Sequence, residues 1–418
     1  MRKYKLGDIA TVEISGVDKK IKDGEKEIRL CNFVDVYYNW AITTAQHDSF
    51  MLATARPNEI SKFKLKKGQV ALTKDSETRD DIGIPTYIAD GFDDAILGYH
   101  CALVTPNKDI LDGRYLNALL HTDYAKKYFA CNASGSGQRY ALSVEALNSF
   151  PVPIIPLHEQ KQIGEIFSAL DKKIELNKRI NQNLEAMAKQ LYDYWFVQFD
   201  FLNEEGKPYK SNGGEMLWND KLKRNIPVGW HCGNLFEIAV FTNGLACQKF
   251  RPKDDEVPLP VIKIREMHDG ISVDTEEVTS NIPESVKVYN GDVLFSWSAS
   301  LEVMLWAYGL GGLNQHIFKV TSANDFPKSF YYFQLLDYID VFKKVAEARK
   351  TTMGHITQDH LQQSTIAIPD NKDIADKFEE LISPIFRQIV KLQEEISNLI
   401  KQRDELLPLL MNGQITIE

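Results

Sequence analysis

The sequence predicts an α+β protein in which two duplicated globular domains are separated by two long antiparallel coiled-coil helices, with an approximate two-fold relation between the halves. Two observations predict this architecture. Two long stretches of the chain carry apolar residues at heptad spacing and contain few helix breakers. Each stretch follows a segment rich in short β-like runs, and these two segments share motifs in the same order.

The first globular domain is predicted over residues 1–155. Its β-like runs include Ile28–Val36, Gln69–Lys74 and Cys101–Thr105, each bounded by turn-forming residues. One helix is expected at Gly113–Ala130, where aromatic and leucine side chains recur at helical spacing. A flexible glycine- and serine-containing loop, Ser134–Arg139, then leads into the last strand of the domain.

The first long helix is predicted within residues 156–199. No proline follows Pro156 and no glycine follows Gly164 in this stretch, so nothing interrupts the helix. At about 1.5 Å per residue the helix is roughly 55–60 Å long, which exceeds the width of most domains, so its narrow apolar stripe requires a partner. With Ile163 as heptad position a, the predicted seam contains Ile163, Ile166, Leu170, Asn177, Ile180, Leu184, Met187 and Leu191. Asn177 is either a solvent-facing mismatch or a buried polar residue that fixes the register of the helix pair.

A connector, residues 200–230, follows the first helix. Its glycines and prolines stop regular structure, while Trp218 and Trp230 predict that it lies against the rest of the protein.

The second globular domain, residues 231–369, repeats the first. Six short motifs recur in the same order, and each domain ends in a proline directly before a long helix. The two halves therefore arose by a diverged duplication. The pairs are Leu6–Ala10 with Leu235–Ala239, Lys67–Ala71 with Asn290–Leu294, Gly113–Ala130 with Ser329–Val345, Ser136–Arg139 with Thr352–His355, Ser143–Leu147 with Thr357–Leu361, and Val152–Pro156 with Ile366–Pro369.

The second long helix is predicted within residues 370–418, which also include the C-terminal tail. Its predicted seam contains Ile382, Ile385, Ile389, Leu392, Ile396, Leu399, Leu406 and Leu410. Pro384 is expected to kink or break this helix near Ser383. Two unrelated amphipathic helices are the simpler interpretation, but the duplicated domain in front of each helix favours a pair.

Composition indicates a soluble cytoplasmic protein. No apolar run reaches the ~18–20 residues that span a membrane, and the first residues lack the apolar stretch of a signal peptide. The five cysteines are scattered and form no CxxC pair, which favours free thiols over disulfides or a zinc site. The net charge of −9 argues against a global attraction to nucleic acid, so any such surface must be a local patch.

Motifs for catalysis are missing from the sequence. It contains no GxGxxG-type cofactor loop, no GxxxxGK[ST] phosphate loop, and no histidine pair at HxxxH spacing. Acidic pairs such as Asp80-Asp81 lie in polar turns, where a solvated loop is a better interpretation than a metal site. We therefore predict a protein that is not an enzyme, with no catalytic residue and no metal site.

The chain resembles the specificity (S) subunits of type I restriction–modification enzymes over essentially its whole length. The residues that carry the resemblance are Gly135–Gln138, Pro156–Gln160, Gly206–Ser211, Gly213–Met216, Ile226–Trp230 and the ending Leu406–Gln414. The second helix departs from the pattern, because it opens with Pro369–Asp373 in place of a Pro-Leu-x-Glu-Gln motif and contains Pro384.

The resemblance implies a specific division of labour. Each globular domain would be a target recognition domain that reads one half of a bipartite site on double-stranded DNA. The helices would set the gap and dock two modification (methyltransferase) subunits, which restriction (translocase/nuclease) subunits would join. S-adenosylmethionine, ATP and Mg are expected on those partner subunits, with no cofactor in this chain. The alternative is a coiled-coil protein-interaction scaffold without DNA specificity, which would not need two domains with arginine- and amide-bearing loops.

Candidate DNA-contacting residues are basic and amide side chains on loops of the two domains. Arginine and glutamine can form two hydrogen bonds to one base edge, whereas lysine mostly contacts phosphate. For any single one, an ordinary solvated side chain is the simpler interpretation. The candidates are Lys62, Lys64, Lys74, Arg79, Gln138 and Arg139 in the first domain, and Lys249, Arg251, Lys263, Arg265, Arg349, Lys350, Thr352 and His355 in the second.

Overall fold

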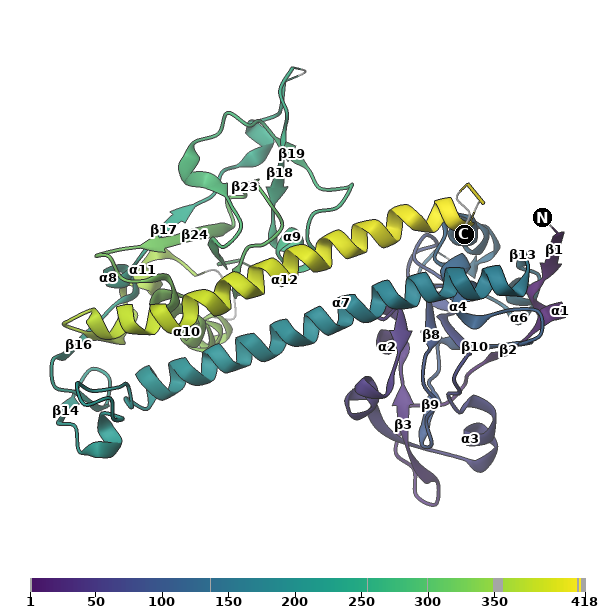
Figure 1. The fold of residues 1–418 in the computed structure, drawn as a ribbon, viewed down its shortest axis with the longest axis horizontal. Coiled ribbons are helices and arrows are strands. Elements are labelled where there is room, and N and C mark those ends of the chain that lie inside the picture. The colour runs from purple at the N-terminus through teal and green to yellow at the C-terminus, as the bar shows by residue number, and fades with distance from the viewer. Residues whose placement is uncertain are drawn as a thin grey trace. The chain divides into compact units, whose positions relative to one another are not determined.

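A computed structural model describes residues 2–135, 137–253, 255–298, 300–348, 356–411 and 413–414. The chain divides into two compact units, Met1–Glu175 with Leu399–Glu418, and Leu176–Asn398. The long helices α7 (Leu157–Tyr192) and α12 (Asp373–Met411) each contribute one part to either unit (Figure 1). A π-helical turn, Asp193–Val197, extends α7. Each unit therefore contains one globular domain and a segment of both long helices.

Two sheets form the framework of the first domain. The larger sheet has the strand order β2-β10-β6-β8-β4, in which only the β4 and β8 pair is parallel, and the smaller has the order β5-β3-β9. A separate antiparallel pair, β1 with β13, brings the two ends of the domain together. The strands are β1 (Arg2–Lys5), β2 (Ala10–Ile14), β3 (Lys26–Cys31), β4 (Ala41–Ile42), β5 (Met51–Ala55), β6 (Val70–Thr73), β8 (Pro85–Ile88), β9 (Ala95–Leu97), β10 (Cys101–Pro106) and β13 (Pro151–Ile154).

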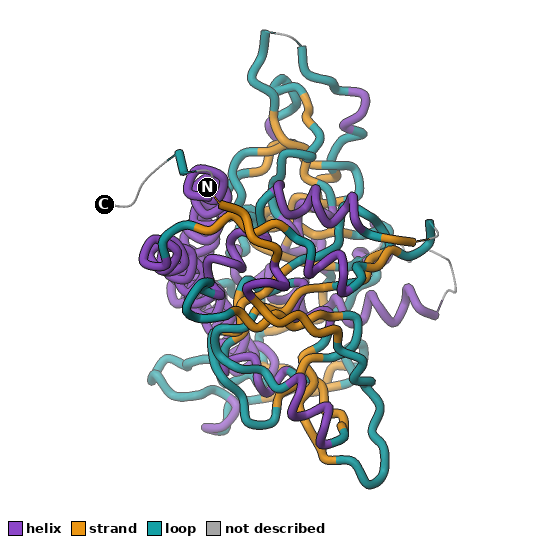
Figure 2. The backbone as a smooth tube through the Cα atoms, turned by 90° about the vertical axis from the view of Figure 1, so that its right-hand side faces the viewer, coloured by secondary structure: helices purple, strands orange, loops and turns teal. Residues whose placement is uncertain are grey.

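Short helices and a third small sheet complete the first domain. The sheet has the order β11-β12-β7 and brings the predicted loop beside the end of β6. Figure 2 shows how much of the chain is loop between these short elements. The elements are β7 (Asp75–Ser76), β11 (Ser134–Gly135), β12 (Tyr140–Ala141), α1 (Leu6–Ile9), α2 (Phe33–Tyr37), α3 (Pro57–Phe63), α4 (Gly113–Leu120), α5 (Asp123–Asn132) and α6 (Val144–Asn148).

The second domain repeats this framework. Its sheets have the orders β17-β24-β21-β22 and β19-β18-β23-β20, and the antiparallel pair of β16 with β25 corresponds to β1 with β13. Gly68 and Gly291 precede the equivalent strands β6 and β21 with φ of 98° and 87°, a conformation that glycine adopts without strain. The elements are β16 (Trp230–Gly233), β17 (Ala239–Asn243), β18 (Leu259–Ile262), β19 (Glu277–Val278), β20 (Lys287–Val288), β21 (Val293–Ser296), β22 (Glu302–Leu305), β23 (Gly311–Leu313), β24 (Ile317–Ser322), β25 (Ile366–Pro369), α8 (Leu235–Ile238), α9 (Ile264–Asp269), α10 (Lys328–Ala348) and α11 (Gln358–Gln362). The predicted α+β fold with two duplicated domains and two long helices is confirmed.

The duplication extends to the way in which the long helices pack. In the first unit, Ile163 and Phe167 from the start of α7 share a core with residues from the end of α12. In the second unit, the start of α12 and the end of α7 share a core in the same way. At one constant spacing along the sequence, Ile163 and Phe167 correspond to Phe378 and Ile382, and Leu407, Leu410 and Met411 correspond to Tyr192, Trp195 and Phe196. Within each unit the two helix segments run antiparallel, because the start of one accompanies the end of the other.

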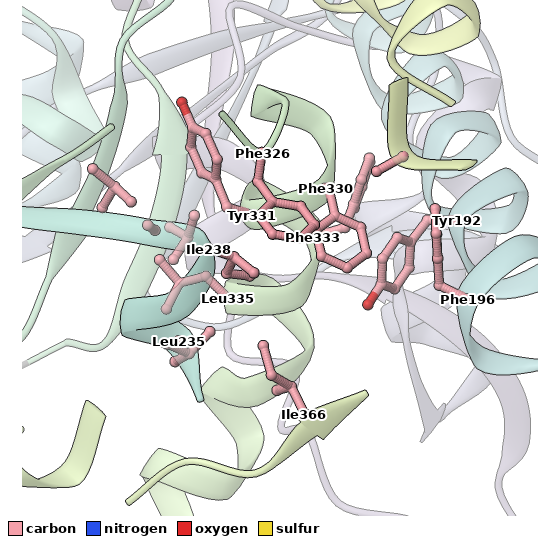
Figure 3. Packing of buried hydrophobic residues seen from close by; sticks show 14 of the residues in the cluster. Tyr192, Phe196, Leu235, Ile238, Phe326, Phe330, Tyr331, Phe333, Leu335 and Ile366 are labelled. Atoms are coloured by element: carbon pink, nitrogen blue, oxygen red, sulfur yellow. The ribbon is translucent and has the colours of Figure 1, made fainter. Parts of the chain in front are cut away.

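Aromatic rings dominate the core of the second unit. Tyr192 and Phe196 point toward α10 (Figure 3), where Tyr192 lies 5.1 Å from the Phe333 ring and Phe196 lies 5.0 Å from the Phe330 ring. Phe196 also meets the Phe378 ring of α12 edge to face at 5.0 Å. Phe196, in the π-helical turn that extends α7, thus packs against both α10 and α12.

Truncation of this side chain tests the packing. Phe196→Ala is expected to lower the free energy of unfolding of the second unit by ~3–5 kcal/mol, because it empties a buried site between three helices. The neighbouring Val197 is 40% exposed, so Val197→Ala is a matched control and should cost far less. Urea unfolding of the full chain measures both variants. Equal losses would show that the aromatic cluster is not the core of this unit.

For α7, heptad position a was assigned correctly, whereas position d was assigned wrongly over most of the helix. The a positions Ile163 and Asn177 are buried, and Leu170, Leu184 and Leu191 are half-buried. The other buried residues of the seam each lie one residue after a predicted d position. They are Phe167, Ile174, Asn181, Ala188 and Trp195. Ile166 is half-buried and packs against the core of the first unit, as Leu170 does, whereas Ile180 and Met187 are 37% and 43% exposed, so the predicted place of these two residues in the seam is wrong. The apolar residues on this helix form two adjacent stripes, and spacing alone selected the wrong neighbour.

The two asparagines of the α7 seam are buried. Asn177 is 1% exposed, which excludes the solvent-facing interpretation, and among the described residues its side-chain amide has no hydrogen-bond partner. Asn181 Nδ2 donates to the Ile389 carbonyl of α12 at 3.3 Å. That bond ties α7 to α12 within the second unit. A role of Asn177 in the register of the helix pair stays a prediction.

The seam of α12 lies as spacing predicts, but its proline does not act as expected. Ile382, Ile389, Leu392, Ile396 and Leu410 are buried, and Ile385, Leu399 and Leu406 are half-buried. The helix is continuous through Pro384, so the predicted break near Ser383 is wrong. Pro384 and Glu380, whose carbonyl loses its helical partner, are both exposed, so water can solvate that carbonyl.

Three local predictions for the domains and connector need correction. The run Ile28–Val36 is a strand only to Cys31, because Asn32 and Asp35 form a capping box that starts α2. The helix expected at Gly113–Ala130 is divided into α4 and α5, since Thr122 caps a new helix start. In the connector, the strands β14 (Met216–Asn219) and β15 (Arg224–Pro227) form a hairpin; Trp230 is 8% exposed, but Trp218 is 59% exposed.

Among the described residues, no helix is long and apolar enough to cross a membrane. The five cysteines are free.

Candidate nucleic-acid interface

A cleft of about 830 Å³ opens on the surface of the first domain. Its lining comes mainly from the helix α2, the strand β7, the two residues that precede β12 and the two residues that precede β10. The lining combines side chains that can form hydrogen bonds with aromatic rings. Its lining includes Asn32, Phe33, Tyr37, Tyr38, Ser76, Thr78, Tyr99, His100, Gln138 and Arg139.

Asp75, His100 and Arg139 meet on one side of this cleft. The Asp75 carboxylate is hydrogen-bonded to His100 Nδ1, and Lys74 Nζ lies 2.8 Å from its other oxygen. Burial on its own would raise the pKa of Asp75, but the hydrogen bonds from Lys74 and His100 outweigh it and lower the pKa. Asp75 therefore stays ionised and orients the imidazole.

Arg139 stacks on this oriented imidazole. Its Nη2 lies 3.3 Å from both ring nitrogens of His100, and equal distances to the two nitrogens place it over the ring face. The neighbouring Tyr99 ring is 4.0 Å from the imidazole. Among the described residues, no hydrogen bond or ion pair involves the Nε or Nη1 of Arg139, so the guanidinium can present several donors to a ligand.

The part of the cleft that α2 contributes is aromatic. The Tyr37 hydroxyl donates to the Asp81 carboxylate, at 3.0 and 2.9 Å from its two oxygens, and its ring stacks on Phe33 with centroids 5.7 Å apart. Tyr38 is 75% exposed, and the nearby Val34 and Met51 are 57% and 45% exposed. This apolar, aromatic rim beside a guanidinium suits the faces and edges of bases better than a soluble ion.

The structure gathers four of the six candidate residues of the first domain. Gln138 and Arg139 line the cleft, Lys74 adjoins it through Asp75, and Arg79 stacks on the Tyr140 ring of β12 at 5.0 Å. The other two lie in ion pairs outside the cleft lining: Lys62 with Glu13 at 3.3 Å, and Lys64 with Asp93 at 3.4 Å.

The candidates of the second domain are not gathered in the same way. Lys263 pairs with Glu276, and Arg265 pairs with the buried Glu266, at 2.5 and 2.7 Å. Lys249, the last residue of the 3-10 helix Cys247–Lys249, and Arg251 in the loop after it are both exposed. Arg349, Lys350, Thr352 and His355 lie outside the described residues.

The second domain has polar residues of its own at the place equivalent to the cleft, and sequence reasoning missed them. Trp297, which follows β21, donates from its indole nitrogen to Asn243 Oδ1 at 3.2 Å, and its ring lies 5.5 Å from His316. Gln315 Nε2 lies 3.4 Å from His316 Nε2. In the first domain, His100 and Tyr37 were missed as well. Only the Asn-x-x-Asp capping pattern at Asn32 gave a signal, since it marks the start of the helix α2 that carries Tyr37.

Removal of the guanidinium tests this surface of the first domain. Arg139→Ala is expected to relax or weaken recognition of one half of a DNA site, by ~1–3 kcal/mol if the side chain meets a base edge. Arg56, in the same domain and paired with Glu59 at 2.7 Å, is the matched control. Competition binding with half-site variants measures both. An equal loss over both halves and over non-specific DNA would assign Arg139 to phosphate contact or folding.

Comparison with known proteins places this fold. A family model described as "Type I restriction modification DNA specificity domain" matches residues 1–186 and 227–402. The type I restriction enzyme MjaIX specificity subunit of Methanocaldococcus jannaschii is 25% identical over 319 residues, covering 74% of this chain and 71% of that protein. The HindI specificity subunit of Haemophilus influenzae is 23% identical over 413 residues, covering 85% and 88%.

A solved structure has the same fold. The S subunit of a type I restriction–modification system from M. genitalium matches with a TM-score of 0.57 and 13% identity, over 98% of this chain and 95% of that one. A duplicated α+β domain followed each time by a long helix is thus a fold of S subunits. Since the family match covers both domains and most of both helices, the chain belongs to the type I restriction–modification DNA specificity family.

Proposed function

We propose that this chain is the DNA-reading subunit of a type I restriction–modification complex. The domain of residues 1–155 reads one half of a bipartite site, and the domain of residues 231–369 reads the other. The helices within 156–199 and 370–418 set the gap between the halves and dock two methyltransferase subunits, and 200–230 connects the repeats. The observation that carries the proposal is the family match over both copies of the duplicated domain.

Two kinds of evidence support two reading surfaces. Four strands of the larger sheet have the same order in both domains, β2-β10-β6-β8 and β17-β24-β21-β22, and the helix packing recurs in both units, so both domains have the framework for the same task. The residues around the equivalent polar sites differ, with Arg139 and His100 in one domain and Gln315 and His316 in the other. A shared framework with different side chains is what two different half-sites require.

Docking of partner subunits on the helices is supported by a second apolar stripe on α7. Leu176, Ile180 and Met187 are 45%, 37% and 43% exposed, and their spacing places them on one face of the helix. Leu381 of α12 is 48% exposed. Apolar residues that the chain itself leaves uncovered suit a helical partner.

In this proposal, the partner subunits catalyse the methylation and the cleavage of DNA. Methyltransferase subunits would bring S-adenosylmethionine, and restriction subunits would bring ATP and Mg for translocation and cleavage. Among the described residues, no three histidine, cysteine, aspartate or glutamate side chains are grouped as ligands of a metal ion. The chain itself would be non-catalytic and would act in the cytoplasm. A scaffold without DNA specificity is disfavoured, because the family match includes both globular domains.

Reconstitution tests the proposal. The purified chain alone is expected neither to methylate nor to cut DNA, and the same preparation with methyltransferase subunits is expected to methylate adenines at a bipartite site. Incorporation of labelled methyl groups into plasmid DNA measures both samples. Methylation or cleavage by the chain alone, or site-independent methylation by the complex, would contradict the proposal.

A further inference from the structure

A histidine occupies the same backbone position in both domains. Cys101 of β10 pairs with Thr73 of β6, and Ile317 of β24 pairs with Ser296 of β21, so His100 and His316 each precede the equivalent strand by one residue. The His100 carbonyl accepts a hydrogen bond from Lys74 N at 2.9 Å, and the His316 carbonyl accepts one from Trp297 N at 3.3 Å.

The next backbone bond confirms that these positions are equivalent. The Lys74 carbonyl accepts a hydrogen bond from Leu142 N at 2.8 Å, and the Trp297 carbonyl accepts one from Ile356 N at 3.1 Å. The sequences on either side of the two histidines are otherwise unlike. The equivalence therefore comes from the backbone and not from a shared motif.

Each histidine contacts a different side chain, and both of these side chains can form two hydrogen bonds to one base, which makes each of them a hydrogen-bonding fork. His100 is oriented by Asp75 and carries the guanidinium of Arg139 over its ring, with Nη2 at 3.3 Å. His316 is flanked by Trp297 and holds the amide nitrogen of Gln315 at 3.4 Å. In both domains the imidazole fixes one nitrogen of the fork, so the rest of the fork is presented in a restricted orientation.

These two forks match different bases. Arginine binds O6 and N7 of guanine, and glutamine binds N6 and N7 of adenine, each through two hydrogen bonds in the major groove. The Arg139 Nη2 has two hydrogens, so it can meet His100 with one and use the other, together with Nη1 or Nε, to form two hydrogen bonds to guanine. The Gln315 amide nitrogen has two hydrogens, so it can meet His316 with one and adenine N7 with the other, while its oxygen accepts from N6.

We propose that Arg139 and Gln315 are the base-reading residues of the two domains, that Arg139 reads a guanine in one half-site and Gln315 an adenine in the other, and that His100 and His316 are positioning residues. This inference rests on the proposed function. It predicts a G·C pair and an A·T pair in opposite halves of one bipartite site.

The methylated motif of variant complexes tests the proposal. Arg139→Ala should relax one G·C position in one half, and Gln315→Ala one A·T position in the other half, with discrimination against the other bases falling roughly 5- to 150-fold. His100→Ala and His316→Ala should relax the same single position as their partner's variant, by a smaller factor. The double variants Arg139→Ala with His100→Ala, and Gln315→Ala with His316→Ala, should relax that position no further, because each pair acts as one unit.

Matched histidines serve as controls. His47 of the first domain lies 2.8 Å from Asp94, and His268 of the second lies 3.2 Å from Glu302, so each has a carboxylate partner but precedes no equivalent strand. His47→Ala and His268→Ala should leave the motif unchanged. Sequencing of methylated random-site libraries, with each full complex of chain and methyltransferase subunits, measures all variants.

The outcomes separate this inference from the proposed function. If the wild-type complex methylates a bipartite motif but the variants leave it intact, relax other bases, or weaken a whole half-site evenly, the reading assignment is wrong and the proposed function stands. If the wild-type complex shows no bipartite motif, the proposed function fails first.

Discussion

Insertion of seven helix-forming residues into α7 between Glu175 and Leu176, together with seven into α12 between Asn398 and Leu399, is expected to lengthen the gap of the methylated site by about three base pairs. Seven residues add about 10.5 Å of helix at ~1.5 Å each, and DNA advances ~3.4 Å per base pair. Seven residues also fall only about 20° short of two full turns, so the seam of the helix pair stays in phase. The bases of each half-site should not change.

The place of the insertion follows from the structure. The two helices pass from one compact unit to the other at these positions, so an insertion there leaves the interior of both units intact. An insertion near the end of α7, after Leu191, would instead displace Tyr192, Trp195 and Phe196 from the aromatic core of the second unit.

The control is the same insertion outside the helices. Seven residues added in the exposed turn between Glu204 and Glu205 should leave the gap as it is. An unchanged gap with full methylation in the helix variant would show that the helices do not set the spacing. A changed half-site would show that they influence the reading surfaces as well.

The second large effect is expected from truncation. A fragment ending at Asn212 keeps the first domain and α7 but loses the residues of α12 that complete its core, Leu407, Leu410 and Met411. It also exposes Tyr192, Trp195 and Phe196, which lose their partners in the second unit. Because these two sets occupy corresponding places, a second copy of the fragment can supply what the first lacks, and we expect a dimer.

The two copies of the first domain in such a dimer should each recognise one half of a DNA site. With methyltransferase subunits, it is expected to direct methylation to a palindromic site, in which the half-site of the first domain is repeated in inverted orientation. Sedimentation at micromolar concentration and the methylated motif are the two measurements. A fragment that stays monomeric would contradict the interchangeable packing of the two helices.

A variant of the fragment tests the correspondence directly. The first core accommodates Leu407, Leu410 and Met411, which are smaller than the aromatic residues that would replace them. The triple variant Tyr192→Leu, Trp195→Leu and Phe196→Met should therefore dimerise more tightly than the unmodified fragment. Weaker association would show that the aromatic residues do not enter the place of the α12 residues.

Sequence reasoning predicted the two long helices because their apolar residues recur at heptad spacing, and it predicted the duplication because six short motifs recur in the same order. It failed at the second heptad position of α7: the spacing chose the apolar Ile180 and Met187, whereas the buried residues are their neighbours Asn181 and Ala188. The reason is tertiary, since Asn181 bonds the Ile389 carbonyl of α12 and no pattern in the sequence contains that contact. Pro384 was misjudged because an exposed carbonyl tolerates the loss of its helical partner.

The candidate interface was predicted only in part. Gln138 and Arg139 stood out because they follow a glycine-containing loop, and they do line the cleft. His100 gave no signal, since its importance lies in contacts with Asp75 and Arg139, which come from distant parts of the sequence. Lys62 and Lys64 were chosen for charge alone, and their pairing with Glu13 and Asp93 is a property of the folded domain.

One measurement tests the central claim most directly: the methylated motifs of a host genome with and without this gene, in a strain that retains the methyltransferase subunits. The account predicts one bipartite motif, two defined halves around a gap of fixed length, that is methylated only when the chain is present. Methylation that does not depend on the chain, or a chain-dependent motif that is continuous and undivided, would contradict it.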